Sequence, residues 1–253
     1  MKYRKWAIAL VAAAAACGEL PRNQNSGTNN ANKGGRPAAT AIASPTPIKG
    51  EKVTVSEDVR FTAEQDSPNW KWTDPSASGT TIEVERSEDT LKFVVPTGRD
   101  LYGTNGSAPR FIKPVEGDFQ IEVRIKFDPR EDYQGAGILV QTGPDRYLRF
   151  ERGFGGVEGG TSGLRLDVRT GSDYKAITTP DDVPTEATSV DLKLLRIANS
   201  FTAFWRVNED SEWKEVGLYE SEYPQGVEVG LIACNTGVPI RVEFSNLKLA
   251  PVP

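Results

Sequence analysis

The stretch that most constrains this chain runs from Gly117 to Gln141, where apolar and polar residues alternate. Over residues 119–127 every second residue is Phe, Ile or Val, and Gln, Glu, Arg and Lys lie between them. Successive side chains of a β-strand point to opposite faces, so this period predicts a long strand with one buried face. A polar turn over residues 129–132 leads to an apolar run at 138–140, which predicts a second strand.

Similar strand patterns continue to the C-terminus, and no segment shows a convincing helical period. They lie at residues 146–152, 164–168, 190–197, 201–207, 227–234 and 240–249. Asn199 and Ser200 are predicted to form the tight turn of a hairpin. Many short strands separated by turns are typical of antiparallel sandwiches. The chain is therefore predicted to be all-β, with the architecture of a jelly-roll β-sandwich.

The first 17 residues have the pattern of an export signal. Three basic residues in the first five positions precede an apolar run over 6–16, which is too short to span a bilayer as a stable helix. Three alanines stand directly before Cys17 and resemble a bacterial lipobox, which predicts lipidation of Cys17. Ordinary signal cleavage near Ala16 is the alternative. The expected location is the bacterial cell envelope, lipid-anchored and facing the periplasm or the exterior.

The rest of the chain divides into a linker and one domain. Residues 18–50 are rich in Asn, Gly, Pro, Thr and Ser. Such a segment cannot bury enough apolar area to offset the entropy of ordering, so it is predicted to be a flexible tether. Residues 51–253 are predicted to form the β-sandwich domain.

Composition excludes several functions. The chain contains no histidine, which excludes histidine-based acid–base catalysis, catalytic triads and His-ligated metal sites. Its formal net charge is -5, and nucleic acid is not an expected partner because phosphate neutralisation needs a basic surface. Cys234 lies in an alternating apolar run and is predicted to be a small buried residue.

Several motifs point to a known family. They are the paired Trp70 and Trp72, GDFQIEVRIKF at 117–127, YQGAGILVQ at 133–141, RYLRFE at 146–151 and VEVGLIACNTG at 227–237. Their order resembles the concanavalin A-like lectin/glucanase superfamily, and within it the family of the regulation-of-enolase protein and of C-terminal domains of some β-xylosidases. The resemblance implies a jelly roll. It also implies a relation to carbohydrates, because the superfamily includes sugar hydrolases, lectins and noncatalytic modules.

Charged and aromatic residues of the strands and loops are the candidate binding residues. Arginine and carboxylate side chains on an exposed sheet face can hydrogen-bond sugar hydroxyls, and aromatic rings can stack on sugar rings. We expect the outer face of the strand at 119–127 and its neighbours to form such a face. The candidates are Arg124, Tyr147, Arg149, Glu151, Arg165, Asp167, Trp72 and Tyr102. The alternative is an ordinary solvated face of alternating charge pairs.

The predicted function is noncatalytic carbohydrate binding. Glucanases of the superfamily carry a Glu-x-Asp-x-Glu strand motif, which this chain lacks. A glycosidase-like alternative would need carboxylates that converge in space, with Glu122, Glu151 and Asp167 as candidates. An envelope protein-interaction scaffold without a small ligand is a third possibility.

No cofactor is predicted from the sequence. Carboxylates at Asp128, Glu131 and Asp132, or at Asp181 and Asp182, suit calcium as a hard cation. Neither group has the spacing of a known calcium loop.

Overall fold

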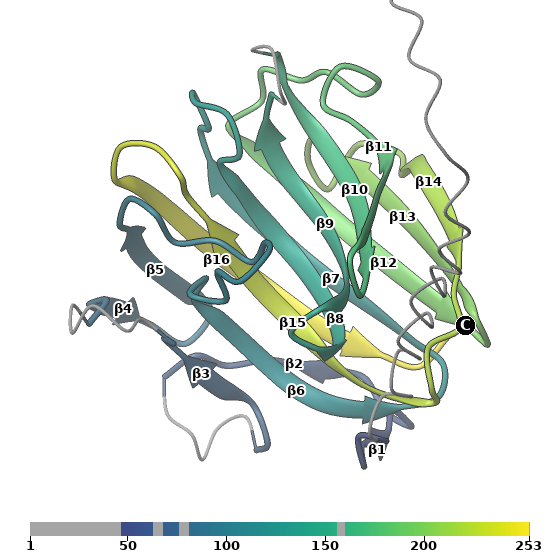
Figure 1. Cartoon of the computed structure of the whole chain (residues 1–253). Helices are drawn as coiled ribbons and strands as arrows, with labels where there is room; N and C mark the ends of the chain where they lie inside the picture. The colour runs from purple at the N-terminus through teal and green to yellow at the C-terminus, as the bar shows by residue number, and fades with distance from the viewer. Residues whose placement is uncertain (1–46, 63–67, 76–80, 156–159, 253) are drawn as a thin grey trace, which may run out of the picture. The chain divides into compact units, whose positions relative to one another are not determined.

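The computed structural model describes residues 47–62, 68–75, 81–155 and 160–252 and shows two β-sheets (Figure 1). These residues form 16 strands and no α-helix, so this part of the chain has no helix that would cross a membrane. The prediction of an all-β antiparallel sandwich is confirmed. The predicted signal segment, Cys17 and nearly all of the linker lie outside the described residues.

The first layer, sheet A, has eight strands. In spatial order it contains β1 (Glu51–Lys52), β6 (Arg110–Glu116), β15 (Gly226–Cys234), β8 (Gly135–Gly143), β9 (Arg146–Phe154), β10 (Ser162–Thr170) and β11 (Asp173–Thr178). The short strand β3 (Lys71–Thr73) also pairs with β6. Neighbouring strands are antiparallel except β1 and β6, which are parallel.

The second layer, sheet B, also has eight strands. In spatial order it contains β14 (Lys214–Glu220), β13 (Ser200–Arg206), β12 (Ser189–Ile197), β7 (Phe119–Phe127), β16 (Ile240–Ala250), β5 (Thr90–Val95) and β4 (Val84–Arg86). The short strand β2 (Glu57–Asp58) pairs with β16. The alternating stretch at 119–127 is thus the centre of this sheet.

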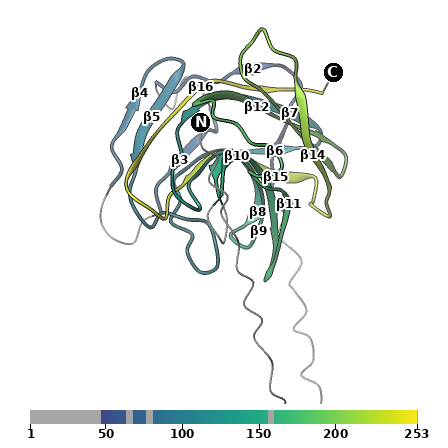
Figure 2. The ribbon, with the colours of Figure 1, turned by 90° about the horizontal axis from the view of Figure 1, so that it is seen from above.

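The chain changes layer between β7 and β8. β7 pairs with β12 and β16 in sheet B, whereas β8 pairs with β9 and β15 in sheet A. Figure 2 shows the two layers from above, with β16 and β12 arching around β15, β8 and β9. The outer faces of β7 and β8, which follow one another in sequence, therefore lie on opposite sides of the sandwich.

The main core fills the space between the sheets. Every second residue of β7, from Phe119 to Phe127, is at most 1% exposed. These side chains join one cluster with residues of sheet A such as Leu148, Phe150 and Leu166. Burial of an aliphatic or aromatic side chain stabilises the fold by roughly 1.5–3 kcal/mol. This core explains the alternating pattern of the sequence.

A second, smaller apolar cluster lies on the outer face of sheet A. Residues 98–109, here named the cover loop, contribute Leu101 and Ala108. The strands contribute Ile112, Leu139, Tyr147, Ile232 and Cys234. Cys234 is 1% exposed, which confirms its predicted burial. The cover loop thus shields part of a sheet face that would otherwise be exposed.

Candidate functional site

Most of the predicted binding residues gather on the outer face of sheet A. Tyr147, Arg149 and Glu151 come from β9, and β10 lies beside it in an antiparallel register. Arg149 is opposite Asp167, and Glu151 is opposite Arg165. Positive and negative side chains therefore alternate both along and across the two strands, which is a favourable cross-strand arrangement. We name these four charged residues the sheet A cluster.

Arg149 is the centre of the sheet A cluster. Its Nε and Nη2 atoms each donate to Asp167 at 3.1 Å, in a two-point contact. Its Nη1 atom donates to Cys234 Sγ at 3.3 Å and lies 3.7 Å from Asp100 Oδ1. Burial opposes the charge of Arg149, but Asp167 and Glu151 outweigh it and hold the pKa of the guanidinium well above its usual value. The Arg149–Asp167 pair is therefore a stable structural unit.

Glu151 is the one member of the sheet A cluster whose carboxylate accepts no hydrogen bond from any described residue. It is fully buried, and its nearest ion-pair contact is Arg149 Nη1 at 3.9 Å. Burial raises the pKa of Glu151, although Arg149 acts in the opposite direction. A Cβ atom on Gly135 would lie 2.6 Å from Glu151 Oε2, so a glycine there leaves room for the carboxyl group.

Two exposed tyrosines stand at the rim of this face. Tyr102 of the cover loop is 55% exposed and Tyr174 of β11 is 43% exposed. Their ring centroids are 5.9 Å apart and their planes meet at 84°. Tyr174 donates its hydroxyl to Asp167 Oδ2 at 3.1 Å, and burial with the nearby Asp167 charge raises the pKa of Tyr174. We name Tyr102 and Tyr174 the tyrosine pair.

The cover loop holds Tyr102 in place through contacts with the sheet. Tyr147 donates its hydroxyl to Leu101 O at 2.5 Å, and burial raises the pKa of Tyr147 to about 12. Arg169 donates to Gly103 O at 3.0 Å, with its guanidinium 5.8 Å from the Tyr102 ring centroid. Gly103 has a φ of +61°, which suits glycine in the tight turn after Tyr102. The tyrosine pair is therefore preorganised.

The remaining predicted binding residues lie elsewhere. Arg124 is on β7, so its side chain belongs to the outer face of sheet B. Trp72 packs edge-on against Phe93 at 5.0 Å between centroids, with Arg86 5.9 Å above its ring. The expectation of one shared binding face is thus wrong for Arg124 and Trp72. The chain crosses to the other layer after β7, and Trp72 joins the edge of the core.

The expected exposure of the predicted face is also wrong for the sheet A cluster. All four of its residues are buried: Arg149, Glu151, Arg165 and Asp167. Arg165 is held by main-chain oxygens of Phe154, at 3.0 Å, and of Gly155. A ligand would therefore meet the tyrosine pair first, and of the buried charges Asp167 holds Tyr174 through its hydroxyl group.

The candidate catalytic carboxylates do not form one site. Glu122 is on the outer face of sheet B, and the core separates it from Glu151 and Asp167 on sheet A. Asp167 already contacts Arg149 with both of its oxygens. The glycosidase-like alternative needed all three carboxylates to converge, and Glu122 does not join the other two because its strand belongs to the other layer.

Four of the five candidate calcium carboxylates have protein partners among the described residues, whereas Asp132 Oδ1 is buried without a hydrogen-bond partner there. Asp128 pairs with Arg130 at 2.6 Å, and Asp181 accepts a hydrogen bond from Thr161 Oγ1 at 2.7 Å. The main-chain and side-chain hydrogen bonds of Thr179 lower the pKa of Asp182. Among the described residues, no group of three or more carboxylate or cysteine side chains is placed to hold a metal ion.

The sequence interpretation missed the role of Asp100, Arg169 and the cover loop. Arg169 and Tyr174 are cross-strand neighbours in β10 and β11, so a correct hairpin register would have placed them together. Nothing local in the sequence indicates that the cover loop folds back onto β9, because Leu101 and Tyr147 are 46 positions apart.

Comparisons with known proteins agree with the fold. The family described as "Protein of unknown function (DUF1349)" matches residues 58–252. A comparison with curated proteins found no significant match. Among solved structures, a functionally unknown protein from Saccharomyces cerevisiae is 17% identical with a TM-score of 0.60, covering 73% of this chain and 97% of that chain.

Two glycosidase-related structures are also similar. A xylan β-1,4-xylosidase from Bacillus halodurans C-125 is 14% identical with a TM-score of 0.57, covering 79% of this chain and 40% of that chain. A Bacteroides ovatus protein described as "Xyloglucan PUL GH43B" is 14% identical with a TM-score of 0.54, covering 83% of this chain and 42% of that chain. The chain thus spans about two fifths of their lengths. The predicted concanavalin A-like jelly roll is confirmed.

Proposed function

The chain belongs to the DUF1349 family of unknown function, and we propose that it is a noncatalytic module that binds carbohydrate through the tyrosine pair. The observation that carries this proposal is the exposure of two rigidly held aromatic rings, Tyr102 and Tyr174. Aromatic rings present large apolar area with a polar hydroxyl, which suits the mixed surface of a sugar. Preorganisation lowers the entropy that binding would otherwise cost.

The angle between the rings favours one form of carbohydrate. Rings at 84° form a corner and cannot both lie flat on one plane. A crystalline polysaccharide surface would need rings that share a plane. We therefore propose that the ligand is a soluble glycan, with one sugar ring against Tyr102 and its neighbour against Tyr174.

The similar glycosidase structures are consistent with such a module. This chain corresponds in length to about two fifths of each of them, so the likeness concerns a part of those proteins. At this level of identity the likeness supports the fold. The support for sugar binding comes from the tyrosine pair.

The proposed location rests on the sequence of the first 17 residues. A basic start, an apolar run and Cys17 support an exported protein that is lipid-anchored in the bacterial envelope. The Asn- and Pro-rich residues 18–50 would then hold the domain away from the membrane. Such an arrangement would let the tyrosine pair reach glycans outside the cytoplasm.

Calorimetric titration of the full-length chain in mild detergent tests the proposal. The ligands are neutral oligosaccharides of xylose, mannose and glucose. We expect binding of at least one of them, and Tyr174→Ala should weaken it about tenfold through loss of ring contact. Tyr174→Phe should weaken it less, because the ring remains while the hydrogen bond to Asp167 is lost.

Tyr133→Ala is the matched control for the titration. Tyr133 is also exposed, at 44%, but lies two residues before Gly135, at the other end of β8. Its replacement should leave the affinity unchanged. Equal affinities for wild type and Tyr174→Ala would contradict the proposal.

A further inference from the structure

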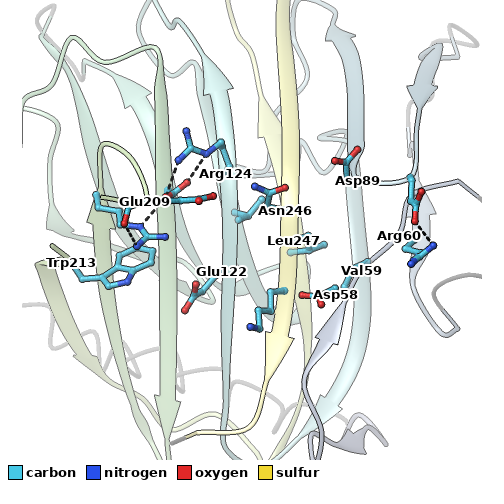
Figure 3. Close-up of a pocket in the computed structure, with 15 residues that line it drawn as sticks. Asp58, Val59, Arg60, Asp89, Glu122, Arg124, Glu209, Trp213, Asn246 and Leu247 are labelled. Carbon is cyan, nitrogen blue, oxygen red and sulfur yellow. Dashed lines mark hydrogen bonds and ion pairs between the residues drawn. The ribbon is translucent and has the colours of Figure 1, made fainter. Parts of the chain in front are cut away.

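A groove on the outer face of sheet B is a second candidate site, and it goes beyond the proposed function. Its volume is about 530 Å³, within the range of roughly 300–1,000 Å³ common for ligand pockets. It extends across β2, β16, β7, β12 and β13 (Figure 3). Val59, Val123 and Leu247 line it although their side chains are buried, so strand backbone forms the floor. The core lies between this groove and the tyrosine pair.

One side of the groove is a block of charges set by strand register. Arg124 is opposite Asp191, which is opposite Arg206. In the next row Glu122 is flanked by Lys193 and Lys248. Each of these two carboxylates therefore lies between two cations. Glu209 also lines this side of the groove (Figure 3), so the four cations of the block lie among three carboxylates.

The two arginines are fixed in place with donors to spare. Arg124 contacts Asp191 through Nε at 2.9 Å and Nη2 at 3.0 Å. Arg206 contacts Asp191 through Nε at 2.9 Å and donates Nη1 to Glu209 O at 3.1 Å. The side chains of Arg124 and Arg206 remain 26% and 20% exposed. A guanidinium has five N–H donors, so both can bind a further anion.

Trp213 packs against two of the cations of this block. Its ring lies 4.4 Å from the Arg206 guanidinium and 4.2 Å from Lys193 Nζ. Burial, with Arg206 nearby, lowers the pKa of Lys193, although Glu122 acts in the opposite direction. Stacking on an indole ring orients the guanidinium at little entropic cost. The Arg206 guanidinium is therefore held between the Asp191 carboxylate and the Trp213 ring.

The opposite side of the groove is acidic. Asp58 and Asp89 line it together with the ion pair between Arg60 and Glu88 (Figure 3). Asn246, at a bulge of β16 with a φ of +52°, lies between the two sides. Carboxylates accept hydrogen bonds from hydroxyl groups but repel a second anion. A ligand that matches both sides carries an anion at one end and hydroxyl groups at the other.

We propose that this groove binds a saccharide that carries a carboxylate, such as a uronic acid residue. Its carboxylate binds to Arg124 and Arg206, and its hydroxyl groups face Asp58 and Asp89. The two arginines supply charge-assisted hydrogen bonds, which fix the orientation of the sugar. This site is independent of the tyrosine pair, so either can fail in experiment without the other.

Titration of the full-length protein with two acidic trimers tests the inference. Trimers of galacturonic acid and mannuronic acid are compared with neutral trimers of galactose and mannose. At least one acidic trimer should bind more tightly than its neutral counterpart, and its affinity should fall as salt rises. Arg124→Gln should weaken that binding about tenfold. Asp191 keeps its contact with Arg206 in this variant, so the local fold is retained.

Arg241→Gln is the matched control because it removes the same charge from the same sheet. Its side chain is 62% exposed, and the groove does not include it. Lys248→Gln provides a second groove variant should Arg124→Gln fail to fold. The inference is overturned if neither acidic trimer binds, or if the groove variants bind as wild type does. Loss of binding in Tyr174→Ala with full binding in Arg124→Gln would also overturn it.

Discussion

The buried carboxyl group of Glu151 should make the stability of the fold depend on pH. A buried carboxyl group without a hydrogen-bond donor favours its protonated form, and the pKa of Glu151 is raised. A raised pKa in the folded state stabilises the fold at low pH. This contribution is lost as the pH rises from the unfolded value, about 4.3, through the folded value.

The first prediction concerns Glu151→Gln. The variant cannot ionise, so its stability relative to wild type should increase with pH, by up to about 1.4 kcal/mol per pH unit in the titration range. Urea unfolding at several pH values between about 4 and 8 measures the difference in slope. Glu215→Gln, at an exposed position of β14, is the control and should follow wild type. Parallel curves for wild type and Glu151→Gln would refute the explanation.

The second prediction concerns the buried Arg149–Asp167 pair. Arg149→Met leaves the Asp167 carboxylate buried without its guanidinium, which should cost about 3–5 kcal/mol of unfolding free energy. Arg149→Met with Asp167→Asn should recover part of that loss. Arg241→Met removes an exposed arginine, 3.6 Å from Glu85, and should change stability by less than about 1 kcal/mol. If Arg149→Met and Arg241→Met lower the unfolding free energy equally, burial of the ion pair is not the cause of the loss.

At the scale of strands, β8 depends on a glycine. A Cβ atom on Gly137 would lie 2.0 Å from the main-chain oxygen of Phe150 on β9. Main chain within a sheet cannot shift without breaking its hydrogen bonds, so Gly137→Ala should cost about 3 kcal/mol. Gly106 of the cover loop has no atom within 4 Å of such a position, and Gly106→Ala should be nearly neutral. Thermal unfolding compares the two, and a neutral Gly137→Ala would be inconsistent with the close approach.

The positions of strands could be predicted because alternation is a local pattern. The pairing of strands could not be predicted in the same way. The alternation at 119–127 predicted β7 with its observed bounds. The hairpin turn was predicted at Asn199 and Ser200, but Ile197 pairs with Ser200, so the turn is Ala198 and Asn199. A shift of one residue in the turn changes the partner of Asp191 from Asn208 to Arg206. The charged block of the groove was therefore hidden from sequence reasoning.

For the whole molecule, the fold class followed from the sequence but the assignment of strands to layers did not. Tyr147, Arg149 and Glu151 were correctly grouped with Arg165 and Asp167, because β9 and β10 are adjacent in sequence and in space. Arg124 was misplaced because layer changes depend on long-range packing. Arg149 also lies 3.7 Å from Asp100 of the cover loop, which is far away in sequence.

The proposed lipid anchor makes a prediction about the location of the whole chain. Cys17→Ser removes the thiol that would be acylated, so the chain should move from the membrane fraction to the soluble fraction. Cell fractionation with labelled fatty acid measures both the location and the modification. If the wild-type chain carries no fatty-acid label and is found in the soluble fraction, the proposed lipid anchor is contradicted.

A glycan array with the full-length chain in mild detergent tests most directly whether the tyrosine pair binds carbohydrate. The double variant Tyr102→Ala, Tyr174→Ala is compared with wild type and with Tyr133→Ala. We expect wild type and Tyr133→Ala to bind the same neutral glycans and the double variant to bind none of them. If the double variant still binds neutral glycans, the tyrosine pair is not the carbohydrate site. The same conclusion follows if wild type binds no neutral glycan.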